Sequence, residues 1–201
     1  MGYLHHVLDS SIRVFMREVN SLRLLIINGA IPIMVISMYK ALGSVFLNYV
    51  VAIIPATGYY IRPIIADVAS FMGGLMGLIA AVSALTSIVT SIFIVNGLVR
   101  GWRGELRAVY SLYRDRAGVI IHVITVLTLS SLYSYVIGIA VSVTLALIIL
   151  KTLSSLGVLP LVNYSVDVVG TALTALPIFA ILLMAYIITG ITVVARHDLT
   201  P

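Results

Sequence analysis

The stretch Val119–Leu150, VIIHVITVLTLSSLYSYVIGIAVSVTLALIIL, decides the fold class of this chain. It contains no Asp, Glu, Lys or Arg. A helix needs about 20 apolar residues to cross a bilayer, and this stretch is longer. A single strand in lipid would leave its backbone N–H and C=O groups unpaired. The stretch therefore predicts a membrane-spanning helix.

Three further stretches have the same character, so the sequence predicts four spans, over about 24–50, 64–99, 119–150 and 168–195. Helix-breaking residues separate them, with Pro55, Gly58 and Pro63 in the first connection and Gly157 and Pro160 in the third. Hydrophobic residues make up 61% of the chain and charged residues 9%, whereas a soluble domain carries about a quarter charged residues. We therefore expect an all-α integral membrane protein of the cell membrane, with one four-helix transmembrane domain over 24–201.

The segment 1–23 has a different pattern. Its apolar residues recur at helical spacing, with the polar residues Arg13, Arg17, Glu18 and Asn20 on the other side; they are Val7, Leu8, Ile12, Phe15, Val19 and Leu22. This pattern predicts an amphipathic helix that lies in the plane of the membrane interface. A disordered tail is the alternative.

The basic residues predict the orientation, because cytoplasmic loops are enriched in Lys and Arg. The N-terminal segment, the second connection and the C-terminus hold 9 of the 12 Lys and Arg residues. An even number of spans places both termini on one side, so both termini and the second connection are expected in the cytoplasm. The net charge of +5 is thereby explained without a nucleic-acid partner.

The sequence lacks the motifs of nucleotide-binding and metal-binding sites, which excludes several classes of function. The chain has two lysines, and neither follows the glycines that a phosphate-binding loop requires. It has no cysteine, and its histidines do not form a zinc-binding pattern. No catalytic, cofactor or metal residues are assigned, and we expect no enzyme activity in this chain and no cofactor.

Two features inside the spans are candidates for function. Lys40 is the one charge well inside a span, and it either marks a functional site or extends its side chain to the outer interface. The cluster Gly73-Gly74-x-x-Gly77 allows close helix approach, either within one subunit or between two.

The second connection, 100–118, reads RGWRGELRAVYSLYRDRAG. Leu106, Val109, Leu112 and Tyr113 fall on one helical face, and arginines occupy much of the remainder. A charged loop that sets topology is one interpretation. The other is a short helix that docks into a cytoplasmic partner, since buried aromatic residues and arginines are favoured interface anchors; its contact residues would be Arg100, Trp102, Arg103, Glu105, Leu106, Arg107, Tyr110 and Leu112.

At this point the sequence resembles the FtsX/MacB-type family of ABC transporter permeases. Asn96 resembles the asparagine near the end of the family's second span, and Glu105-Leu106 resembles the Glu-Ile pair of its cytoplasmic segment. Ser111-Leu112 resembles the later Ala-Leu, and the run from Arg116 to Ile120 resembles the basic stretch that enters span three. Tyr110 and Tyr113 depart from the family pattern.

The resemblance implies a permease subunit that pairs with a second permease subunit and binds separate ABC ATPase subunits. The family's large domain between spans one and two is missing, since only about 51–63 is available there. We therefore expect a hydrophobic substrate, a lipid or peptide, that enters from the membrane. The alternative is a scaffold that anchors a membrane assembly without transport.

Overall fold

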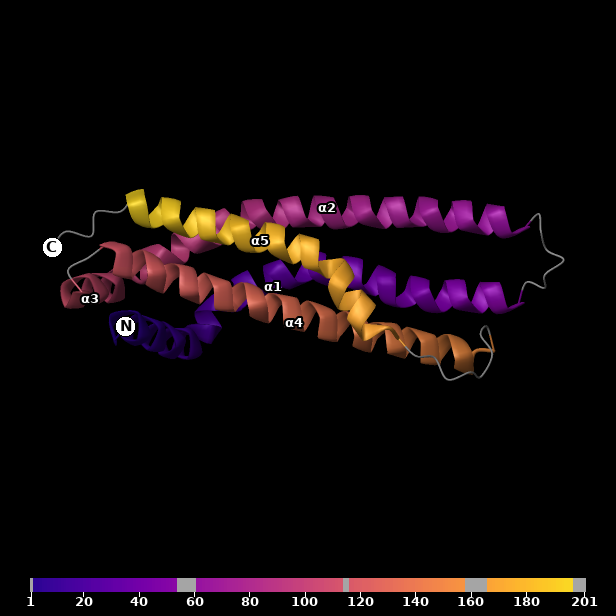
Figure 1. The fold of residues 1–201 in the computed structure, drawn as a ribbon, viewed down its shortest axis with the longest axis horizontal. Helices are drawn as coiled ribbons and strands as arrows, with labels where there is room; N and C mark the ends of the chain where they lie inside the picture. The colour runs from indigo at the N-terminus through magenta and orange to yellow at the C-terminus, as the bar shows by residue number, and fades with distance from the viewer. Residues whose placement is uncertain (1, 54–60, 114–115, 158–165, 197–201) are drawn as a thin grey trace. The chain divides into compact units, whose positions relative to one another are not determined.

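The computed structural model describes residues 2–53, 61–113, 116–157 and 166–196, and every regular element in these ranges is a helix. Figure 1 shows the five helices, which are α1 (Gly2–Ile53), α2 (Ile61–Gly101), α3 (Arg103–Tyr113), α4 (Arg116–Ser155) and α5 (Val168–Arg196). Four of them contain stretches long and apolar enough to cross a membrane, at Val7–Val45, Ala66–Gly101, Arg116–Ser155 and Val168–Arg196. The predicted all-α class and the four membrane-spanning helices are confirmed, and the chain has the character of a multi-pass membrane protein.

The helix bounds refine the predicted spans. α5 begins at the predicted residue, whereas α4 runs on past Leu150 to Ser155. Pro63 was expected in the first connection, but α2 begins at Ile61 and Pro63 lies in its first turn. The first turn tolerates proline because its N–H groups have no partner within the helix. Pro55, Gly58 and Pro160 lie outside the described residues.

Local interactions stabilise two helix ends. Beyond α4, Gly157 has a φ of 71° and its N–H donates to the carbonyl of Ser154 at 3.1 Å, a left-handed conformation that glycine adopts without strain. Before α5, the Asp167 carboxylate accepts a hydrogen bond from the N–H of Gly170 at 2.9 Å, as an N-cap residue does. Pro177 lies inside α5, which continues past it.

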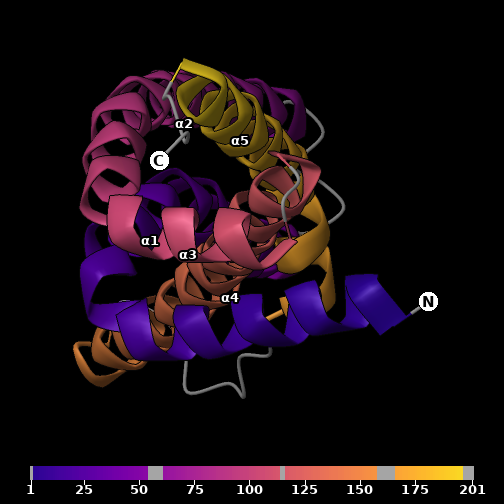
Figure 2. The same ribbon diagram turned by 90° about the vertical axis from the view of Figure 1, so that its left-hand side faces the viewer.

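The first helix differs from the prediction of two separate helices. α1 is one continuous helix from Gly2 to Ile53. It changes direction between Glu18 and Leu24, so that its N-terminal part runs across the view in Figure 2. Whether this part lies in a membrane interface stays a prediction.

The helices contribute to two compact units. The first unit comprises 1–30, 85–135 and 179–201, and the second comprises 31–84 and 136–178. Two of the divisions along the chain fall within two residues of a proline, Pro32 in α1 and Pro177 in α5.

The first unit has an extensive apolar core. Side chains from all five helices meet there, and the largest fully buried ones include Leu22, Leu25, Leu106, Leu127 and Tyr186. Its helices also approach closely at Gly29, where a Cβ atom would lie 2.7 Å from the Tyr186 hydroxyl and 2.8 Å from Ser134 Oγ. Glycine permits this approach because it has no side chain.

Polar contacts join α1 to α2 in the first unit at the position where a proline interrupts α1. Pro32 has no N–H, so the carbonyl of Asn28 lacks its usual helical donor. Ser87 Oγ donates to that carbonyl at 2.8 Å, and Asn28 Nδ2 donates in return to the carbonyl of Ser87 at 2.8 Å. Neighbouring serines commonly satisfy backbone groups that proline frees in membrane helices.

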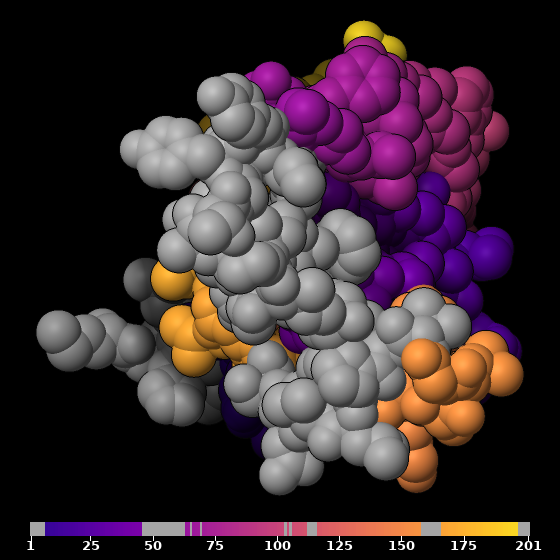
Figure 3. Space-filling model, turned by 90° about the vertical axis from the view of Figure 1, so that its right-hand side faces the viewer, coloured from indigo at the N-terminus to yellow at the C-terminus, as the bar shows by residue number. Residues whose placement is uncertain are grey.

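The second unit has a smaller apolar cluster than the first among the described residues. Val45 and Leu150 are its buried pair, with Leu42, Leu153 and Val166 packed against them. Serines and threonines such as Ser83, Ser142 and Thr144 donate to carbonyls three or four residues earlier in their own helix. Figure 3 looks onto this unit at the start of α2 and the end of α4.

A cavity of about 530 Å³ opens in the second unit among α1, α2 and α4. Four methionines contribute to its almost wholly apolar wall, Met34, Met38, Met72 and Met76. The unit also contains Ser37, whose Oγ is fully buried and has no hydrogen-bond partner.

Candidate functional site

The junction of α2 and α3 is the first part of the candidate site. The N–H of Trp102 donates to the carbonyl of Leu98 at 2.9 Å, and the N–H of Leu106 donates to the carbonyl of Trp102 at 2.9 Å. Helical hydrogen bonding therefore continues from α2 into α3 across the turn. Within the first unit, α3 lies across the end of the other helices in Figure 2. A displacement of α3 would consequently act directly on α2.

Two side chains fix α3 to the first unit. Trp102 is 6% exposed and Leu106 is 1% exposed, and both belong to the apolar core. Val109 and Tyr110 pack against the same core. Trp102 and Leu106 belong to the predicted contact set for a partner, and within this chain their buried side chains hold α3 against the core.

The opposite face of α3 is exposed and carries mostly small residues. It is formed by Gly104, Arg107, Ala108 and Ser111, and Arg100 at the end of α2 is also exposed. Their spacing of three and four residues places the first four on one helical face. Arg107 belongs to the predicted contact set, whereas Gly104, Ala108 and Ser111 do not, although small residues at helical spacing were a usable signal. The side chains of Arg103, Glu105 and Leu112 lie outside the described ones.

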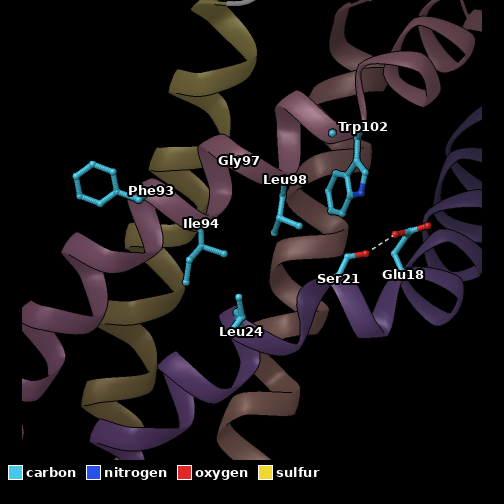
Figure 4. Close-up of a pocket in the computed structure, with 9 residues that line it drawn as sticks. Glu18, Ser21, Leu24, Phe93, Ile94, Gly97, Leu98 and Trp102 are labelled. Carbon is cyan, nitrogen blue, oxygen red and sulfur yellow. Dashed lines mark hydrogen bonds between the residues drawn. The ribbon is translucent and has the colours of Figure 1, made fainter.

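A groove of about 420 Å³ lies beside the junction, between α1 and α2 in the first unit (Figure 4). From α1 it is lined by Glu18, Ser21 and Leu24. From α2 and the following turn it is lined by Phe93, Ile94, Gly97, Leu98, Gly101 and Trp102. A Cβ atom at Gly97 or Gly101 would meet nothing within 4 Å, so the glycines leave the groove open.

The N-terminal part of α1 packs on α4 within the first unit. Ser11 Oγ and His122 Nδ1 form a buried hydrogen bond of 2.8 Å, and the rings of Phe15 and Tyr133 are 5.3 Å apart. The predicted apolar face is in fact two faces. Val7 and Phe15 are buried with Ser11, whereas a ridge of apolar side chains stays exposed, formed by Leu8, Ile12 and Met16.

The remaining predicted residues lie in the second unit. A Cβ atom at Gly73 would meet the Tyr39 hydroxyl at 2.8 Å, whereas Gly74 and Gly77 face open space. Gly73 thus serves packing inside the chain, and its two neighbours are open to lipid or to another subunit. Lys40 is partly buried in α1, which leaves both of its interpretations open.

No group of three or more His, Cys, Asp or Glu side chains that could hold a metal ion occurs in the described part of the chain. Comparison of the chain with protein-family models, with curated proteins and with solved structures found no match.

Proposed function

We propose that this chain is a permease subunit of an ABC transporter of the FtsX/MacB type, in a minimal form without a large extracytoplasmic domain. ATP hydrolysis takes place in separate ATPase subunits, and this chain couples it to the movement or extrusion of a hydrophobic substrate. The observation that carries the proposal is α3, a short amphipathic helix with a buried inner face and an exposed outer face, joined by helical hydrogen bonds to a spanning helix.

The outer face of α3 suits a coupling contact. Gly104, Ala108 and Ser111 are small, so a groove on an ATPase approaches the helix backbone closely there, while Arg107 supplies a charge for a partner carboxylate. Trp102 and Leu106 act from inside, because a push on α3 reaches the core through them. Arg103, Glu105 and Leu112 complete the proposed contact set.

The distribution of basic residues supports a cytoplasmic α3. The first unit contains both ends of the chain and 9 of its 12 Lys and Arg residues. The positive-inside tendency then places this unit towards the cytoplasm. In that orientation the N-terminal part of α1 lies in the interface, with Leu8, Ile12 and Met16 dipping into lipid and Arg13 and Arg17 in the headgroup layer.

A second permease subunit completes the proposed transporter. The open positions Gly74 and Gly77 lie on α2 among exposed apolar side chains that include Phe71, Leu75 and Leu78. A helix without side chains at two nearby positions allows a partner helix to approach closely in lipid. This face of α2 is therefore the proposed contact between the two permease subunits.

Cysteine labelling tests the topology and the partner together, because the chain contains no cysteine of its own. Single cysteines at Ser111 and, as a control, at Ser83 in the second unit are introduced into the full chain in its native membrane. We expect Ser111→Cys to react only with membrane-permeant maleimides and to cross-link to a nucleotide-binding subunit. Labelling of Ser111→Cys by an impermeant reagent from outside the cell would refute the orientation, and a complex without any nucleotide-binding subunit would refute the function.

Charge reversal separates transport from the scaffold alternative. We expect Arg107→Glu to uncouple ATP hydrolysis from transport while the subunits still assemble, and Arg196→Glu at the end of α5 to leave coupling intact. ATPase activity and complex mass are measured in the same reconstituted sample. If Arg107→Glu causes the complex to dissociate, and the wild-type complex has no substrate-stimulated ATPase activity, the chain is a scaffold.

A further inference from the structure

The groove between α1 and α2 in the first unit has two chemically different ends (Figure 4). One end is apolar and is bordered by Leu24 and Phe93, which are 67% and 73% exposed. The other end holds the Glu18 carboxylate, the Ser21 hydroxyl and the Trp102 indole. Glu18 is the one ionisable group among the lining residues.

The groove runs along the axis of a spanning helix. Phe93 and Trp102 are nine positions apart on α2 and the turn that follows it, which corresponds to about 13 Å along a helix at about 1.5 Å per residue. Exposed Leu24 and Phe93 belong in hydrocarbon, whereas tryptophan is enriched at membrane–water interfaces. The groove therefore extends from the depth of the acyl chains to the depth of the headgroups.

The carboxylate has room for another donor. Ser21 Oγ donates to Glu18 Oε2 at 2.7 Å, and Arg17 Nε lies 3.4 Å from Oε1. A carboxylate offers about four acceptor positions, so a further N–H donor is accommodated. Arg17 is 60% exposed at its side chain, and water screens such a pair strongly. Glu18 consequently remains an attractive site for a second cation.

We propose that this groove binds a phospholipid with a primary amine in its headgroup. The ammonium donates a charge-assisted hydrogen bond to Glu18 beside the Trp102 ring, and one acyl chain lies along Leu24, Ile94 and Phe93. Gly97 and Gly101 form the floor, where a larger side chain would fill the space. A lipid fits better than a peptide because the apolar end of the groove suits an acyl chain and the single carboxylate at the other end suits an ammonium group. The proposal concerns binding alone and does not require an ATPase partner.

Trp102 reports on the groove directly because it is the one tryptophan of the chain. The full chain is reconstituted in nanodiscs of phosphatidylcholine that contain increasing fractions of a lipid brominated on its acyl chains. Brominated phosphatidylethanolamine, phosphatidylglycerol and phosphatidylcholine are compared as quenchers of Trp102 fluorescence. We expect phosphatidylethanolamine to quench at about tenfold lower mole fraction than the other two, the effect of one hydrogen bond to a charged group.

Two variants and two controls decide the assignment. Glu18→Gln is expected to remove the preference for phosphatidylethanolamine, whereas Asp9→Asn, which removes an exposed carboxylate on the same helix, keeps it. Gly97→Leu fills the groove and is expected to reduce quenching by every lipid, whereas Ala81→Leu, at an exposed position of the same helix outside the groove, does not. Circular dichroism confirms that each variant is folded.

Three outcomes would overturn the proposal. One is equal quenching by all three lipids. Another is a preference for phosphatidylethanolamine that survives in folded Glu18→Gln or in folded Gly97→Leu. The third is fluorescence that depends on the protein-to-lipid ratio or on an added lysine-rich peptide but not on lipid type, which would assign the groove to a second copy of the chain or to a basic protein segment.

Discussion

The two units differ in how their helices are joined. In the first unit, side chains donate hydrogen bonds from one helix to another, as between Ser87 and Asn28, between Ser134 and the carbonyl of Ile26, and between Ser11 and His122. In the second unit, Ser83, Ser142 and Thr144 donate to carbonyls of their own helices, and an apolar cavity lined by methionines lies between the helices. Directional bonds fix one arrangement, whereas methionine-rich apolar contacts tolerate several.

In the proposed transporter, this difference would suit two separate roles for the units, transmission of movement and contact with the substrate. The first unit contains α3 and needs a fixed geometry to pass on a displacement. The second unit would contact a hydrophobic substrate and gains from adaptable packing. The contrast makes quantitative predictions, in which equivalent substitutions have larger effects in the first unit.

The largest expected effect is the truncation of a core leucine. Leu106→Ala removes a side chain that is 1% exposed in the dense core of the first unit, and such changes destabilise by about 2–5 kcal/mol. Leu150→Ala is expected to be less destabilising, because the Leu150 side chain borders the cavity of the second unit and therefore has fewer packing contacts to lose. Unfolding free energies in detergent test the pair, with exposed Leu24→Ala as the control. Equal losses in the two units would contradict the contrast.

A smaller effect is expected from adding one methyl group. Gly29→Ala places a Cβ atom within 3 Å of Tyr186 and Ser134, and overpacking of this kind destabilises by about 1–3 kcal/mol. Gly74→Ala has open space and is expected to leave the midpoint of thermal unfolding unchanged or to raise it, since alanine favours helix. A midpoint for Gly29→Ala equal to that of the wild type would show that the helices are not held at this separation.

The smallest expected effect concerns a single hydrogen bond. Ser87→Ala leaves the Asn28 carbonyl unpaired next to Pro32, which should destabilise by about 0.5–2 kcal/mol. In a Pro32→Ala background the loss should shrink, because the new N–H of residue 32 bonds to the same carbonyl. A double-mutant cycle measured by unfolding gives the coupling. Ser37→Ala serves as the control, because Ser37 Oγ has no partner to lose. The same loss in both backgrounds would disprove the link to the proline.

Much of the fold could be predicted from the sequence because its determinants are local. Apolar length defines the spans, Gly157 ends α4 through its positive φ, and Asp167 caps α5. The continuity of α1 through Leu24 was missed because a change in polarity along a chain does not by itself end a helix. Pro63 was misplaced because proline is compatible with a first helical turn.

The candidate site was harder to predict than the fold. The helical periodicity placed Val7, Leu8, Ile12 and Phe15 on one apolar face, but an apolar face can contact either the protein core or lipid. The pattern could not indicate that Val7 and Phe15 face the core while Leu8 and Ile12 stay exposed. Trp102, which the sequence placed in the contact set for a partner, is likewise buried in the core of the first unit. Tertiary packing, which depends on residues more than 100 positions away such as His122, decides these cases.

The prolines that lie beside two of the divisions between the units have a mechanical consequence. A helix resists bending because hydrogen bonds connect each turn to the next, and a turn next to proline lacks one of these hydrogen bonds. Pro32 and Pro177 therefore create compliant turns at places where the chain passes from one unit to the other. Near Pro32 the hydroxyl of Ser87 on α2 donates a hydrogen bond to the Asn28 carbonyl in place of the missing backbone N–H. The stiffness of that turn therefore depends on the contact between α1 and α2.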